Sequence, residues 1–166
     1  MIRHATAIML LAIAAGTGAE TRAEEMSKWG DTAGWAILID PGNANGCLME
    51  KKLESGTLVQ FGMVPDRDGG FFALYNPDWS DIKDGATGVV TLEFPKKRFV
   101  GDVAGVAKEG RFGGYAFFDN PNVTVEFGKN NEMTVVGELG RNIEVGLSGT
   151  MKAIQAVKAC QSEQSE

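Results

Sequence analysis

The sequence predicts an all-β domain, an antiparallel sandwich or a flattened barrel of about ten short strands, with one C-terminal α-helix. Apolar or alternating runs recur about every 8–12 residues with turn residues between them, which is typical of antiparallel β-folds. The 22 glycines suit the tight turns and bulges of such folds. Only the last segment has the periodicity of a helix.

The chain begins with the three parts of a secretory signal peptide. Arg3 gives a positive start, residues 5–15 form an apolar run, and small residues continue to Ala23. The apolar run is shorter than the roughly 20 residues that cross a bilayer. We therefore expect residues 1–23 to be removed, which leaves one domain at 24–160 that is periplasmic or secreted and has no membrane insertion after cleavage. An N-terminal anchor or a buried helix is the alternative.

Ten segments carry the strand pattern, and residues such as Gly, Asn, Asp and Pro separate them. Two of them, 89–94 and 123–127, alternate apolar and polar side chains along their length. The predicted strands are 35–39, 47–53, 57–64, 71–75, 89–94, 98–106, 115–118, 123–127, 133–136 and 143–147.

The C-terminal segment at about 150–160 is predicted to be a helix. Ser148 or Thr150 can cap it, and an apolar residue recurs every three positions from Met151 to Cys160. A helix of about three turns is not stable alone in water, so it must dock on the sheet. Residues 161–166 are expected to form a disordered tail.

Two cysteines, Cys47 and Cys160, are present in the whole chain. In an oxidising compartment an even number of cysteines favours a disulfide, which would join the C-terminal helix to the sheet. Two free, buried thiols are the alternative. The spacing is not that of a catalytic dithiol.

The composition excludes several classes of function. His4, the only histidine, lies in the predicted signal peptide, so a Ser-His or Cys-His centre is excluded. We expect no catalytic residue, no cofactor and no metal. After residue 23 the net charge is about −7, so we expect no binding to nucleic acid.

One long loop, residues 76–88, combines Trp79 with the acidic residues Asp78, Asp81 and Asp84. An aromatic side chain among carboxylates can bind a sugar or a cation, which makes these four residues a tentative binding loop. Alternatively, Trp79 folds down as a lid on the core.

The two ends of the chain that would remain after cleavage resemble a pattern in small exported alphaproteobacterial proteins. They are also distantly similar to the invasion-associated locus B proteins. The resemblance is carried by Trp35-Ala-Ile, by Gly46-Cys47, and by residues 147–150 (LSGT) before an Ala-rich helix that ends at Cys160. It implies a periplasmic β-domain with an envelope or host-interaction role. No catalytic residue follows from it.

We therefore expect a non-catalytic exported binding or accessory protein of the cell envelope, whose partner is an unknown protein or envelope component. Two alternatives remain. The chain could inhibit an envelope hydrolase by presenting loop 76–88, or it could be a histidine-free hydrolase that uses a pair of carboxylates.

Overall fold

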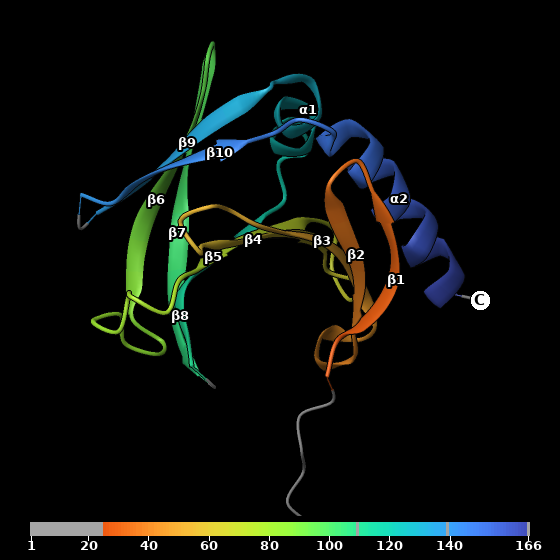
Figure 1. Ribbon diagram of the computed structural model, residues 1–166, viewed down its shortest axis with the longest axis horizontal. Coiled ribbons are helices and arrows are strands. Elements are labelled where there is room, and N and C mark those ends of the chain that lie inside the picture. The colour runs from red at the N-terminus through yellow and green to blue at the C-terminus, as the bar shows by residue number, and fades with distance from the viewer. Residues whose placement is uncertain (1–24, 109, 139, 166) are drawn as a thin grey trace, which may run out of the picture.

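A computed structural model describes residues 25–108, 110–138 and 140–165; the predicted signal peptide lies outside these residues. These residues form ten strands and two helices, which are labelled in Figure 1. The strands are β1 (Ser27–Thr32), β2 (Trp35–Asp40), β3 (Gly46–Lys52), β4 (Leu58–Met63), β5 (Gly70–Tyr75), β6 (Thr87–Phe94), β7 (Lys97–Lys108), β8 (Arg111–Phe118), β9 (Glu132–Gly137) and β10 (Asn142–Gly146). The helices are α1 (Pro121–Lys129) and α2 (Thr150–Gln164), and a short 3-10 turn spans Pro41–Asn43.

All ten strands belong to one antiparallel sheet, in the order β1-β2-β3-β4-β5-β8-β7-β6-β9-β10. The sheet is not closed, because β1 and β10 are its two edges. It bends strongly, so β9 and β10 pass over the central strands towards the helices, as in a sandwich (Figure 1). The prediction of an all-β antiparallel fold with a C-terminal helix is therefore confirmed. No helix among the described residues is long and apolar enough to cross a bilayer.

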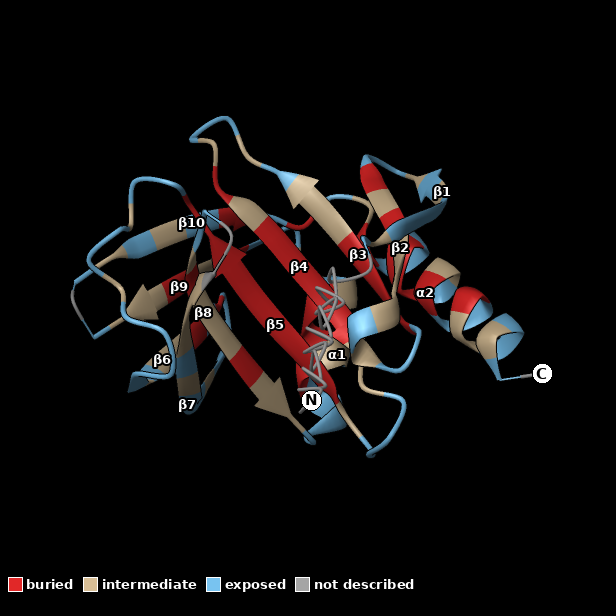
Figure 2. Ribbon diagram, turned by 90° about the horizontal axis from the view of Figure 1, so that it is seen from below, coloured by how far each residue is buried: buried red, intermediate tan, exposed pale blue. Residues whose placement is uncertain are grey.

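The main core lies inside the bend of the sheet. Phe127 of α1 is its centre and makes ring contacts with Phe61, Phe72 and Phe94, at centroid distances of 4.6, 5.5 and 5.6 Å. Strands on both sides of the bend contribute buried residues, among them Trp35, Ile37, Met49, Leu92, Val135 and Val145. Figure 2 shows buried residues running along β4 and β5.

The central strands are buried on their outer face as well. Leu48, Phe71, Ala73 and Tyr75 form a second apolar cluster there, and Phe71 stacks on Tyr115 of β8 at 5.0 Å between ring centroids. Burial on both faces explains why β4 and β5 read as nearly continuous apolar runs instead of alternating ones.

The prediction of a strand at 123–127 is wrong, because these residues lie in α1. Asn120 caps the helix by accepting a hydrogen bond from the Asn122 backbone N–H, and Pro121 occupies the first turn, where it is tolerated. The spacing of Val123 and Phe127 fits either structure, since residues four apart share one face of a helix and also of a strand. Strand β1, which the sequence analysis missed, is mostly exposed.

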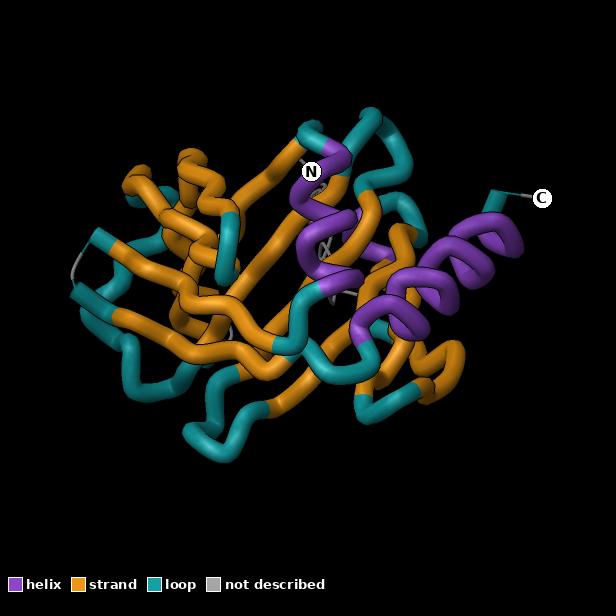
Figure 3. Tube along the Cα trace, turned by 90° about the horizontal axis from the view of Figure 1, so that it is seen from above, coloured by secondary structure: helices purple, strands orange, loops and turns teal. Residues whose placement is uncertain are grey.

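Helix α2 continues to Gln164, so residues 161–164 are helical and not part of a disordered tail. Its N-cap is Gly149, at φ 83°, while the Thr150 hydroxyl donates to the Leu147 carbonyl at 2.8 Å and does not cap the helix. Figure 3 shows α1 and α2 side by side next to the sheet.

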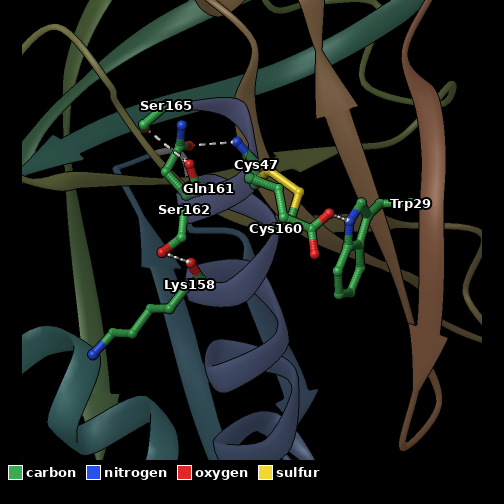
Figure 4. Close-up of a disulfide and its surroundings, with 8 residues drawn as sticks. Trp29, Cys47, Lys158, Cys160, Gln161, Ser162 and Ser165 are labelled. Atoms are coloured by element: carbon green, nitrogen blue, oxygen red, sulfur yellow. Dashed lines mark hydrogen bonds between the residues drawn. A yellow bond between two sulfur atoms is a disulfide. The ribbon is translucent and has the colours of Figure 1, made fainter.

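The far end of α2 is fixed to the N-terminal strands (Figure 4). The predicted disulfide is confirmed: Cys47 of β3 is bonded to Cys160, and both are fully buried. Beside it the Cys47 backbone N–H donates to Gln161 Oε1 at 2.9 Å. Trp29 of β1 donates to Glu163 at 2.8 Å.

Candidate functional site

A cavity of about 340 Å³ lies between the inner face of the sheet and the loop that joins β5 to β6, residues 76–86. Its volume is within the range of small-molecule sites, about 300–1,000 Å³. We call it the loop pocket. Its walls are mainly apolar, and they comprise Phe72, Leu74, Trp79, Ile82, Val89, Val90, Val103, Ala116, Val135 and Ile143.

Small residues on two neighbouring strands leave room for this pocket. Gly105 of β7 is paired with Gly114 of β8, and Gly113 and Ala116 also line the cavity. A Cβ on Gly114 would lie 2.7 Å from Val103 Cγ2. Larger side chains at these positions would therefore fill the pocket or displace its walls.

The roof of the pocket is held in place at both ends. At the start, the buried Asn76 side chain donates to Thr57 Oγ1 at 2.9 Å and accepts from the Asp78 backbone N–H. At the end, Gly105 donates to the Ala86 carbonyl at 2.6 Å and accepts from Gly85 at 2.8 Å. The loop is therefore anchored to the rest of the domain at both of its ends.

One ion pair joins the middle of the roof to the β9–β10 turn. Arg141 Nη2 donates to Asp81 Oδ1 and Oδ2 at 2.6 and 2.7 Å, and this bond holds the pKa of Asp81 below its usual value of 3.8. The Arg141 guanidinium also lies 5.7 Å from the centre of the Trp79 ring. Trp79 is partly buried and packs against the main core.

The structure separates the four residues of the tentative binding loop. Trp79 and Asp81 line the pocket, whereas Asp78 is exposed. Asp84 turns towards β7, where its carboxylate accepts from the Ala107 backbone N–H at 3.1 Å. The loop thus combines a roof over the core with one wall of a cavity.

Sequence reasoning missed the charged residues that complete the mouth, namely Lys83, Glu138 and Arg141. Arg141 lies 60 positions from its partner Asp81. They meet because β6 pairs with β9, a pairing that no local pattern indicates. A single arginine in a glycine-containing turn gave no signal of its own.

Glu126 is the most deeply buried carboxylate that carries a pKa shift, and its contacts are structural. Its side chain is 3% exposed and lies 2.8 Å from Lys129 Nζ and 3.3 Å from Lys97 Nζ. Asn130 donates to its other oxygen at 2.9 Å. Hydrogen bonds from Lys129, Asn130 and Lys97 lower its pKa to about 2. The group therefore stays ionised and fastens α1 to the start of β7.

Of the two carboxylates with lowered pKa values, Asp81 lines the pocket and Glu126 does not. A glycosidase needs one carboxyl group with a raised pKa to act as the general acid, but the shifts at Asp81 and Glu126 are both downward. Among the described residues, no group of three or more His, Cys, Asp or Glu side chains is placed to hold a metal ion.

Comparison with known proteins adds evidence on the fold. No family model and no curated protein sequence matches the chain. The structure is distantly similar to invasion associated protein B from Bartonella henselae. The two structures align with a TM-score of 0.57 over 84% of this chain and 99% of that one, at 13% sequence identity. Since the identity is low, the similarity shows a shared fold.

Proposed function

We propose that this chain is an exported, non-catalytic accessory protein of the cell envelope that binds an apolar ligand in the loop pocket. The observation that carries the proposal is the cavity itself. It is mainly apolar, it has the volume of a small-molecule site, and an ordered loop covers it. An apolar cavity with a few polar groups at its mouth is the usual form of a ligand site.

Export is supported by the signal-like start of the sequence and by the buried disulfide, since disulfides persist in oxidising compartments. The shared fold with an invasion associated protein is in keeping with an accessory role. An inhibitor would present an ordered, protruding loop, but Gly85 and Ala86 at the end of this loop are hydrogen-bonded to Gly105 of β7. The lowered pKa of Asp81, a carboxylate of the pocket, does not favour the hydrolase alternative.

The test is to fill the pocket. Ala116 lies on its wall, so Ala116→Leu should weaken binding of the neutral apolar dye N-phenyl-1-naphthylamine at least tenfold in a fluorescence titration. Ala104→Leu is the matched control, because Ala104 is an exposed residue of the neighbouring strand β7.

Circular dichroism and thermal melts must show that both variants are folded. If Ala116→Leu does not fold, Val103→Phe fills the same cavity from β7. A folded variant with a filled pocket that still binds the dye as tightly as the wild type would refute the assignment of the pocket.

A further inference from the structure

The charges at the mouth of the loop pocket point to the chemistry of the ligand. We propose that the pocket binds an alkyl chain that ends in an anionic head group, a carboxylate or a phosphate. This inference rests on the proposed function, because it specifies what the same pocket binds.

The polar groups of the pocket indicate where a head group would lie. Four charged side chains line the pocket, namely Asp81, Lys83, Glu138 and Arg141, and most of the remaining lining is apolar. An alkyl chain inside the cavity would place its polar end among these four groups, since a charge buried against apolar walls is strongly unfavourable.

Arg141 can bind a second anion without losing its first. Asp81 accepts both of its hydrogen bonds from a single nitrogen, Nη2. Among the described residues, no hydrogen bond involves the Nε or Nη1 atom of Arg141. A guanidinium has five N–H donors arranged to bind carboxylate or phosphate oxygens in pairs, so an anionic head has a free edge of Arg141 to bind.

Lys83 gives an anion a second contact at the mouth, whereas Glu138 is the one carboxylate that a cation could use. Among the described residues no ion pair involves Lys83, which makes it a second free cation at the mouth. A cationic head would find Asp81 already paired and, among the described residues, only Glu138 as an unpaired carboxylate in the lining. A cationic head would also meet a Trp79 ring that already has Arg141 beside it.

A ligand can enter the pocket when the ion pair between Asp81 and Arg141 opens. The Asp81 side chain is 55% exposed and that of Arg141 is 29% exposed. Exposed pairs of this kind are weak, so they open at little cost. An anionic head can enter while the pair is open and then bind the free edge of Arg141 as the pair with Asp81 forms again.

The test compares four ligands with the same ten-carbon chain, by isothermal titration of the mature protein below their micelle concentrations. Decanoate and decyl phosphate carry the two anionic heads, decan-1-ol carries none, and decylammonium carries the opposite charge. We expect at least one anion to bind at least tenfold more tightly than decan-1-ol, and decylammonium to bind most weakly. The tighter of the two anions identifies the head group.

Three variants locate the head group. Arg141→Gln should remove most of the preference for the anion, whereas Asp81→Asn should strengthen anion binding, because it breaks the same ion pair but frees the cation. Lys96→Gln, in the exposed turn between β6 and β7, is the control for net charge and should change nothing. A role of the ion pair in folding alone would instead make Arg141→Gln and Asp81→Asn behave alike.

The outcomes separate this inference from the proposed function. If decan-1-ol binds as tightly as the anions, the apolar pocket stands and the anionic head is refuted. The same conclusion follows if Asp81→Asn weakens anion binding as much as Arg141→Gln does. If none of the four ligands binds, both the inference and the proposed pocket function fail.

Discussion

Reduction of the disulfide between Cys47 and Cys160 should lower the stability of the domain by several kcal/mol. The bond joins residues 113 positions apart, and the chain-entropy model gives about 5 kcal/mol for a loop of that length. Measured values are often lower, because unfolded chains retain structure. We therefore expect a loss of about 3–5 kcal/mol. With a urea m-value of about 2 kcal/mol/M, the midpoint should fall by about 1.5–2.5 M.

The assay is urea denaturation of the oxidised wild type, the reduced wild type and the Cys47→Ala/Cys160→Ala variant. Both sulfur atoms are buried in the core, so the alanine variant also loses packing. The reduced wild type keeps that volume and isolates the effect of the bond. A midpoint shift below about 0.5 M on reduction would show that the cross-link does not restrain the unfolded chain and would refute the reasoning.

Three further predictions concern single side chains. Ile154→Ala should lower the free energy of unfolding by about 2–5 kcal/mol, because Ile154 is buried. Lys152→Ala, on the exposed face of α2, should change it by no more than about 0.5 kcal/mol. Equal effects of the two substitutions in urea melts would contradict the placement of the helix. The pKa of Glu126 is about 2 in the folded protein against an ordinary 4.5, so its ion pairs stabilise the fold above about pH 4.5 and are lost as the pH falls towards 2. Glu126→Gln should therefore flatten the acid side of the stability profile, and an unchanged acid slope would contradict this. Trp79→Ala should cost about 2–3 kcal/mol, less than the roughly 3–5 kcal/mol of a core tryptophan, because Trp79 is only partly buried; an unchanged melting temperature would rule out its role as a roof.

Local patterns predicted the fold class well, because most strands are bounded by turn residues and contain the apolar side chains of the core. They failed where one pattern fits two structures. The segment 123–127 alternates like a strand, yet Asn120 and Pro121 begin a helix there. Strand β1 was missed because it is mostly exposed and lacks the apolar alternation of the other strands.

The site was predicted only in part. The reason is not an ambiguous local pattern, as it was for the fold, but contacts between distant parts of the chain. Trp79 and Asp81 stand out as an aromatic and an acid in one loop, and both line the pocket. Arg141 could not be found in this way, because its position opposite Asp81 depends on which strands pair. Strand order is a property of the whole sheet, and β5 pairs with β8 instead of β6. The pocket lies where this strand order brings segments together that are distant in the sequence.

The position of α2 has a consequence for the order in which the chain can complete its structure. Ribosomes make proteins from the N-terminus, so β1, β2 and β3 emerge first, yet α2 packs against all three of them and is made last. The inner faces of these strands remain uncovered until Cys160 is available. A nascent chain therefore carries exposed apolar strand surface almost to its last residue, and such surface is prone to aggregation. A chain that ends before α2 should keep these strand faces uncovered, whereas a chain that includes α2 can cover them once that helix docks.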